Sequence, residues 1–334
     1  MDRIDAHIHL AGDDGETIGL LEELGLKALN ICVAHPGWRE SSHALFRDLR
    51  AEHPERYAWC TTFDLPDFSA GDTPSVRRAY ADTVAAALRE DLRDGAVAVK
   101  AWKNIGMELR RPDGSWVMID DPIFDPIYES LAGDGVPMIM HIGEPLACWQ
   151  PLDPDSPHYG YYRDHPEWHL HGRPDVPNHA ELIASRDRVL EKHPRLRVVG
   201  AHLGSLEHDV SEVAARLERY PNFAVDISAR LGDLMRQDSG AVAEFVVAHQ
   251  DRIIFGTDVV SRTPLSTLDD ADRARVHATL RRTYEAYFAY LEGTATVEQG
   301  TSRASGLGLD PRVVEKLTAA NALAWYPRLP RHRR

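Results

Sequence analysis

Short apolar runs recur along this chain, and most are followed by a segment whose apolar residues have helical spacing. The runs are rich in Val and Ile and are apolar on both faces, as in parallel strands that helices cover. This repeated strand–helix alternation predicts an α/β fold, and more specifically a closed (β/α)8 TIM barrel. An open, doubly wound sheet is the alternative, but no GxGxxG follows the first run. The predicted strands are Ile4–Leu10, Ala28–Ala34, Tyr57–Phe63, Ala96–Ala101, Pro137–His141, Arg197–His202, Phe223–Ser228 and Arg252–Thr257.

The chain of 334 residues fits one domain, because α/β barrels routinely reach this length as a single unit. We expect the barrel to span residues 1–328 and a basic tail to span residues 329–334. Residues 146–179, after the fifth strand, are too long for a simple connection and too aromatic for a disordered linker. We predict that this insert lies over the catalytic face as a lid. Residues 261–271 are predicted to be a polar loop, residues 293–309 a mobile surface loop, and the chain closes on an amphipathic helix.

Composition limits the partners. Lys and Arg number 38 against 52 Asp and Glu, so the formal net charge is −14. Nucleic acids and anionic membranes bind to basic surfaces, so we expect neither as a partner. We expect a small-molecule substrate, and a homo-oligomer is compatible with the sequence. The three cysteines contain no CxxC, and an odd number offers no disulfide framework, which fits the cytoplasm. No apolar run approaches the ~18 residues of a membrane span. We expect no signal peptide, because its cleavage would remove the first candidate ligands, which begin at residue 7.

Several apolar runs end on a side chain that can bind a metal or move a proton. A buried strand has no packing use for a polar group at its end, and barrels hold their chemistry at the carboxyl ends of the strands. The pattern therefore predicts a ring of strands around a catalytic centre. The residues are His7 and His9, Lys100, His141, His202 and Asp258.

His7 and His9 are two residues apart in a strand, so their imidazoles point to the same face. Neutral imidazole suits Zn, Fe, Mn and Ni. Two hydrogen-bonded histidines on a half-exposed strand are the alternative explanation. Asp5 precedes them on the same face and could orient an imidazole.

His141, His202 and Asp258 each follow a buried run. His141 could instead be a capping or core histidine, and Asp258 could be a helix N-cap. His202 could be a ligand or a proton shuttle. A carboxylate at a strand mouth can bind a metal and accept a proton from a metal-bound water, whose pKa falls to about 7.

The chain resembles the metal-dependent amidohydrolase superfamily, and more narrowly its branch of hydrolases and non-oxidative decarboxylases. The matching motifs are DAHIHL, MIMHIGEP, GAHLGS and FGTD, and their order spans nearly the whole chain. The resemblance implies that His7, His9, His141 and Asp258 bind one divalent transition metal, with Zn favoured over Mn or Fe. It also implies that His202 polarises the substrate or moves a proton.

The chemical state of Lys100 distinguishes a one-metal site from a two-metal site. In two-metal members of the superfamily, a lysine at this strand end is carboxylated and bridges both ions, and His141 and His202 would then hold the second metal. An unmodified Lys100 would instead bind a substrate carboxylate or stabilise an oxyanion. We favour one metal and an unmodified Lys100.

Other residues are candidates for binding the substrate. Arg230 follows the seventh strand and is suited to bidentate capture of a carboxylate, although a surface salt bridge is equally compatible. Together with Lys100 and Lys103 it would make a positive pocket for an anionic substrate. Trp102 and aromatic residues of the insert could form a flat apolar wall for a ring, or could equally be packing for the lid itself. Glu144 is a further binding candidate.

We therefore expect a metal-dependent hydrolase of an ester, lactone or amide, in which Asp258 accepts a proton from the activated water. A non-oxidative decarboxylase of a β-keto or aromatic acid is the alternative. Many decarboxylases of this branch open with Glu-x-His and lack a comparable lysine, whereas this chain has Asp5 and Lys100. A non-catalytic ligand-binding barrel is the third hypothesis, and the intact ligand positions disfavour it.

Overall fold

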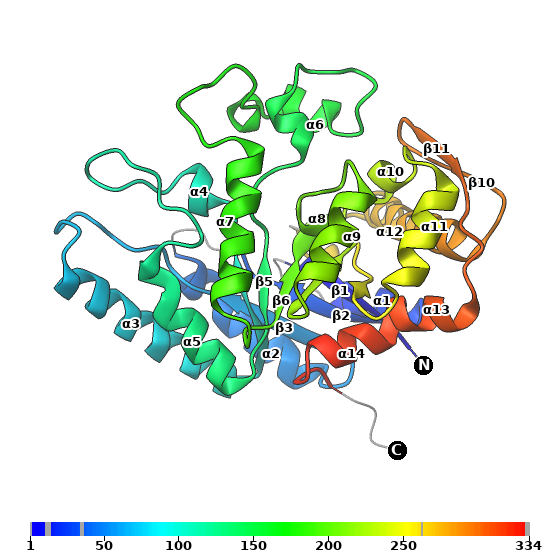
Figure 1. The fold of residues 1–334 in the computed structure, drawn as a ribbon. Coiled ribbons are helices and arrows are strands. Elements are labelled where there is room, and N and C mark those ends of the chain that lie inside the picture. Colours follow the sequence, from blue (N-terminus) through cyan, green and yellow to red (C-terminus); the bar gives the residue numbers. More distant parts are fainter. Residues whose placement is uncertain (1, 11–14, 34–36, 262, 331–334) are drawn as a thin grey trace.

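The computed structural model describes residues 2–10, 15–33, 37–261 and 263–330 (Figure 1). Its main sheet has nine strands, which are all parallel and follow the order β8-β7-β6-β5-β4-β3-β2-β1-β9. Each predicted strand overlaps one of β1–β8, while Ala34 lies outside the described residues and β9 was not predicted. The strands are β1 Arg3–Leu10, β2 Leu26–Ile31, β3 Tyr57–Thr62, β4 Ala96–Ala101, β5 Met138–Met140, β6 Val198–Gly200, β7 Phe223–Asp226, β8 Ile253–Ile254 and β9 Val260–Ser261.

The sheet curls back on itself, because the chain that leaves β8 runs beside β1. The Ala6 amide donates to the Phe255 carbonyl at 3.0 Å, and the Asp258 amide donates to the His7 carbonyl at 2.7 Å. Gly256 permits this close approach, since a Cβ there would lie 2.8 Å from the Cβ of His7. The ends of β1 and β8 are thereby fixed side by side.

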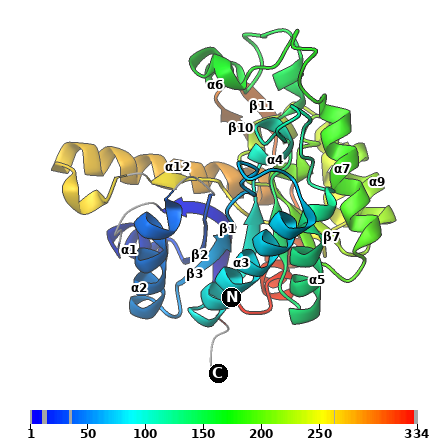
Figure 2. The same cartoon turned by 90° about the vertical axis from the view of Figure 1, so that its left-hand side faces the viewer.

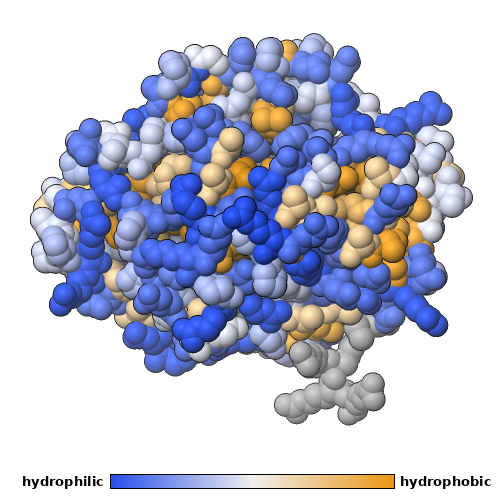
Figure 3. All heavy atoms as spheres, in the orientation of Figure 1, coloured by the Kyte–Doolittle hydropathy of each residue, from blue (hydrophilic) through white to orange (hydrophobic). Residues whose placement is uncertain are grey.

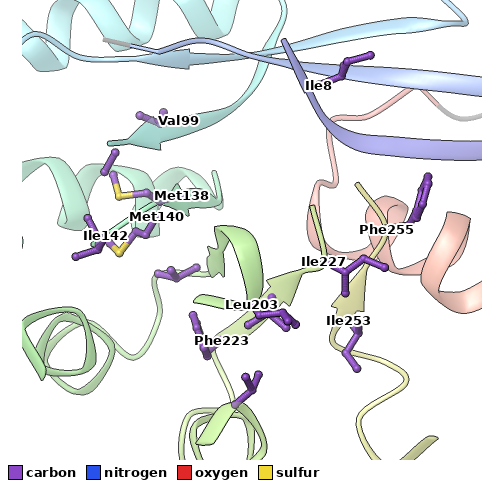
Figure 4. Close-up of a cluster of buried hydrophobic side chains, with 14 of the residues drawn as sticks. Ile8, Val99, Met138, Met140, Ile142, Leu203, Phe223, Ile227, Ile253 and Phe255 are labelled. Atoms are coloured by element: carbon purple, nitrogen blue, oxygen red, sulfur yellow. The ribbon is translucent and has the colours of Figure 1, made fainter. Parts of the chain in front are cut away.

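Helices follow the strands and cover the outer face of the sheet (Figures 1 and 2). The outer core between the two layers includes Ile8, Val99, Met138 and Phe255, part of which Figure 4 shows. The helices are α1 Gly15–Glu23, α2 Ala44–Glu52, α3 Pro74–Arg93, α4 Asn104–Met107, α5 Asp125–Asp134, α6 Tyr159–Asp164, α7 His179–Lys192, α8 Ala201–Gly204, α9 Val210–Arg219, α10 Leu231–Leu234, α11 Ser239–Ala248, α12 Asp270–Glu292, α13 Pro311–Glu315 and α14 Asn321–Trp325.

A second, inner core fills the space enclosed by the strands. Small side chains such as Ala6, Ala98 and Ala224 face inward, and Trp325 and Tyr326 from the end of the chain pack against them. The predicted closing helix is present, and it consists of α13, a π-helical turn over Lys316–Ala320 and α14. This helix lies on the side of the molecule opposite the insert (Figure 1).

Two predicted loops are wrong in part. Residues 293–309 contain a hairpin of β10 Thr296–Gln299 and β11 Ser302–Ser305, whose turn uses Gly300 at φ +56°. Residues 261–271 include the end of β9, a 3-10 turn over Leu265–Thr267 and the start of α12. The 23-residue helix α12 was not predicted. It carries many Arg and Tyr residues, so its apolar stripe is weak in the sequence.

The insert contains η3 Leu146–Trp149, α6 and η4 Pro166–Trp168 and has its own small core around Cys148, Tyr162 and Leu170. Figure 1 shows it above the strands. The face in Figure 3 is mostly hydrophilic with separate hydrophobic patches. Residues 331–334 of the predicted basic tail lie outside the described residues. Among the helices that the structure describes, none is long and apolar enough to cross a membrane.

Candidate active site

A pocket of about 820 Å³ opens at the carboxyl ends of the strands, and its lining includes His158, Tyr161 and Tyr162 of the insert. Every predicted site residue lines this pocket except His7, which lies fully buried beside it. The sequence-predicted residues in the lining are His9, Lys100, Trp102, Lys103, His141, Glu144, His202, Arg230 and Asp258.

A bulge in β1 turns His7 and His9 toward the inside of the curled sheet. Asp5 pairs with Ala28 and Ile8 pairs with Asn30, so β1 has one residue more than β2 over this stretch. Ala6 packs in the inner core before the bulge, whereas Ile8 packs in the outer core after it. Bulges re-aim side chains in this way. The two histidines therefore face inward at the strand end.

His7, His9 and Asp258 form one compact set of possible ligands, whose ligand atoms lie within 4.8 Å of one another. Asp258 Oδ1 is 3.1 Å from His9 Nε2 and 3.6 Å from His7 Nε2. Burial opposes ionisation of Asp258, but the neighbouring histidines outweigh it and hold the pKa of Asp258 well below its usual range. The group is therefore a carboxylate.

Hydrogen bonds fix which ring nitrogen of three histidines faces the pocket. The Nδ1 atoms of His7, His9 and His202 lie 2.7–2.9 Å from the Asp226 carboxylate, the Ile31 carbonyl and the Ser228 carbonyl respectively. These partners only accept, so each Nδ1 carries a proton, and a ring without a second proton has its lone pair on Nε2. Neutral imidazole with a free Nε2 is the form that binds metals.

His141 and His202 lie next to this set. Their ring centroids are 4.4 Å apart, and the ring of His202 is 4.8 Å from that of His7. His141 does not share the compact ligand set of His7, His9 and Asp258. Its Nε2 is buried and has no hydrogen-bond partner among the described residues. Burial lowers the pKa of His202 to about 3 and that of His141 well below the usual value, so both rings are neutral.

Lys100 is fully buried, and its Nζ lies 3.3 Å from His7 Nε2. Burial lowers the pKa of its ammonium group, although Asp226 and Asp258 favour the charged form. The amine thus reaches the place where a metal held by His7 would lie. This position fits both versions of the site that the sequence left open.

Two residues predicted to bind substrate are engaged with each other. Lys103 and Glu144 form a buried ion pair. Lys103 Nζ also lies 3.9 Å from the ring centroid of Trp168 in the insert, and Tyr162 donates to Glu144 at 3.3 Å. The ring of Trp102 meets that of Trp168 edge to face at 6.1 Å. Lys103 and Glu144 therefore connect the barrel to the insert.

Arg230 lines the pocket and, unlike Lys103, forms no salt bridge within the described part of the chain. Its Nε is buried without a hydrogen-bond partner among the described residues, while one Nη donates to the Ala229 carbonyl. Burial disfavours its charge, but nearby carboxylates, chiefly those of Asp233 and Glu207, outweigh burial and raise its pKa. It is a permanent positive charge that can meet a substrate anion.

Asp226, at the end of β7, was not identified from the sequence. It contacts His7 and also accepts from the backbone amides of His202 and Ser228 at 2.8 and 3.1 Å. The same signal as elsewhere, a polar residue that ends an apolar run, could have identified it. Asp5 was expected to orient an imidazole, and this expectation is wrong. Its carboxylate instead accepts from backbone amides, Thr257 and Tyr284, and burial raises its pKa to about 6.

Backbone strain is concentrated at this end of the sheet. Among the described residues other than glycine, positive φ values occur at the ends of β6, β7 and β8. Such conformations cost on the order of 1–3 kcal/mol each and persist where the surroundings impose them. The residues are His202, Leu203, Ser205, Ala229 and Asp258, with φ between 54° and 62°.

Comparisons with known proteins agree with the fold of the chain. Solved structures with the same fold include an uncharacterised TIM-barrel protein from Bordetella bronchiseptica (16% identity, 99% of this chain and 100% of that chain, TM-score 0.56). A second is a probable 2-pyrone-4,6-dicarboxylic acid hydrolase from Acinetobacter baumannii (10% identity, 98% of this chain and 100% of that chain, TM-score 0.53). A third is a 4-oxalomesaconate hydratase from Rhodopseudomonas palustris (13% identity, 98% of this chain and 96% of that chain, TM-score 0.53). No curated protein matches significantly. The profile of the Amidohydrolase family matches residues 4–328, so the chain belongs to this family of enzymes.

Proposed function

We propose that the protein is a metal-dependent hydrolase that cleaves an ester, lactone or amide bond of a small carboxylated substrate. The observation that carries the proposal is the contact between His9 Nε2 and Asp258 Oδ1 at 3.1 Å. The Nδ1 proton of His9 is donated to Ile31, so a neutral ring offers Asp258 only a lone pair. A lone pair and a carboxylate at this distance need a proton or a cation between them.

The donor set fits a divalent transition metal. His7, His9 and Asp258 would hold the ion, and His141 would complete the set with its unpartnered Nε2. Imidazole and carboxylate ligands suit Zn, and Mn or Fe are alternatives. Bound there, such an ion lowers the pKa of water to about 7 and polarises a carbonyl.

The chain's own residues would perform the remaining tasks. Asp258 is ionised and can accept a proton from the attacking water. Lys100 lies close enough to His7 to steady an oxyanion that develops beside the metal. Arg230 would bind a substrate carboxylate, while Trp102 and the insert exclude water from the apolar part of the pocket.

Lys100 and the form of the imidazoles favour hydrolysis over decarboxylation. Lys100 lies where it could stabilise the oxyanion of a hydrolysis. His202 is neutral and Asp258 is ionised, so both are ready to accept a proton from water, whereas a decarboxylase must deliver a proton to a carbanion. We propose one metal with an unmodified Lys100. A second ion would require a carboxylated Lys100, with His141 and His202 as its ligands.

The metal content and the reaction can be measured separately. Purified protein should retain about one equivalent of Zn, Mn or Fe. Less than about half an equivalent, after growth with each metal, would contradict the site. A panel of carboxylated esters, lactones and amides should give hydrolysis. Release of CO2 from β-keto or aromatic acids, without hydrolysis of any panel member, would instead support the decarboxylase.

We also propose that residues 1–328 form a single (β/α)8 domain in which 146–179 is an insert over the site. The partner would be a small molecule rather than nucleic acid or a membrane, and the location cytoplasmic. The buried free thiols of Cys60 and Cys148 fit this location.

A further inference from the structure

We propose that Asp226 is a positioning residue that fixes the tautomer of His7 and orients His202, and thereby makes their Nε2 atoms available at the metal site. The inference rests on the proposed function, because it assigns His7 a ligand role. It adds Asp226 on β7, which lies behind the pocket lining and, among the described residues, makes its hydrogen bonds to His7, His202 and Ser228.

The contacts of Asp226 are divided between its two carboxylate oxygens. Oδ2 accepts from His7 Nδ1 at 2.8 Å. Oδ1 accepts from the His202 amide at 2.8 Å, the Ser228 amide at 3.1 Å and the Ser228 hydroxyl. Asp226 is fully buried, and three donors converge on its Oδ1, as expected for an ionised carboxylate. It is therefore a carboxylate that only accepts.

These contacts join three strands at the site. His7 comes from β1, His202 follows β6, and Asp226 ends β7. The amide of His202 is held by Asp226 in a residue with φ +58°, and its Nδ1 is held by the Ser228 carbonyl. Asp226 thus holds His7 through its ring and His202 through its backbone amide, while Ser228 holds the ring of His202.

The division of contacts predicts what Asp226→Asn would do. Three donors converge on Oδ1, so the amide oxygen of the asparagine must occupy that side. The NH2 group then faces His7 Nδ1, which can no longer donate. The proton of the neutral ring moves to Nε2, and the lone pair that would bind the metal is lost.

The test uses the full chain at pH 8, first without metal. In the wild type, long-range 15N–1H correlations should show His7 protonated on Nδ1, with the signal assigned by its loss in His7→Gln. In Asp226→Asn, the pattern should change to protonation on Nε2. The dissociation constant for Zn should then rise by about 10–100-fold, the range typical of partners that orient metal ligands.

Asp91→Asn is the matched control. Asp91 is also fully buried and lies 2.9 Å from His43 Nε2, on the outer side of β3 and away from the pocket. Both variants should lose stability, but Asp91→Asn should keep the wild-type affinity for Zn. If Asp226→Asn and Asp91→Asn lost the same affinity for Zn, the loss would reflect general destabilisation, and the proposal would be overturned.

Two further outcomes keep the proposal testable. If Asp226→Asn does not fold, the wild-type spectrum decides, because a His7 protonated on Nε2 in the wild type overturns the inference. If the wild type binds no metal, the proposed function fails, while the tautomer measurement on metal-free protein still decides the role of Asp226.

Discussion

At the scale of single residues, the site is defined by hydrogen bonds that point away from it. His7, His9 and His202 each donate Nδ1–H to an acceptor-only group behind the ring. Their Nε2 atoms therefore point away from these acceptors without any ligand having to organise them, and those of His7 and His9 approach Asp258. Preorganisation of this kind lowers the cost of binding a metal.

Asp258→Asn should remove most of the activity. The amide cannot accept a proton as the carboxylate does and is a weaker metal ligand, so we expect turnover to fall by at least about 10²-fold. The rate is measured with the best substrate of the panel, with circular dichroism to confirm folding. Asp164→Asn, on the exposed part of the insert, should be unchanged. Full turnover of Asp258→Asn would exclude its proposed role.

Lys103→Met should chiefly destabilise the protein. The substitution leaves the carboxylate of Glu144 buried and unpaired, which typically costs about 3–5 kcal/mol in the free energy of unfolding. Adding Glu144→Leu should recover much of this loss, because the unpaired charge is removed. Urea unfolding of the two single variants and the double variant gives the coupling energy. Additive effects would show that the pair is not coupled.

At the scale of elements, the sequence predicted the strands because their apolar runs are continuous and their ends are polar. It did not predict α12, whose buried face is built largely from Tyr284, Tyr287 and Tyr290 rather than from aliphatic residues. The hairpin β10–β11 was missed because its strands are short and polar. The sequence did not predict that Asp226 is the partner of His7, because only the fold brings the ends of β7 and β1 to the same site.

Helix α7 contains a histidine that should make stability depend on pH. His179 Nε2 donates to the Ser205 carbonyl at 2.7 Å, and burial lowers its pKa from 6.5 to about 4. Since the unfolded chain binds the proton more tightly, stability is full above pH 6.5 and falls as the pH drops towards 4. The loss should approach roughly 3 kcal/mol.

The measurement compares urea unfolding at pH 7.5 and pH 4.5 for the wild type and His179→Gln. Glutamine keeps a donor for the carbonyl but does not titrate, so the variant should lose less stability between the two values. The difference between the two proteins isolates His179 from the other titrating groups. An identical pH dependence in both would contradict the assignment.

At the scale of the whole molecule, the two ends of the strands have different tasks. The carboxyl ends carry the site and the strained residues, whereas the other end is closed by Trp325, Tyr326 and Leu329 from the last helix and the residues after it. Figure 1 shows the insert and α14 on opposite sides of the sheet. Stability and function should therefore be separable by substitution.

Trp325→Ala tests this separation. Its side chain packs in the inner core, donates to the Asp251 carbonyl at 3.3 Å and stacks under Arg197 at 4.7 Å. Removing it should lower the free energy of unfolding by roughly 3–5 kcal/mol, measured by urea denaturation. Zn affinity and turnover of the folded protein should stay within about twofold of the wild type, because the site is at the other end.

The control for this variant is Val247→Ala, which removes an exposed apolar side chain from α11. It should change the free energy of unfolding by less than about 0.5 kcal/mol. If Trp325→Ala weakened Zn binding as strongly as it lowers stability, the two ends of the strands would be coupled through the inner core. In that case the small side chains between them, such as Ala98 and Ala224, would transmit the change to Lys100 and Asp226, which follow two residues later on the same strands.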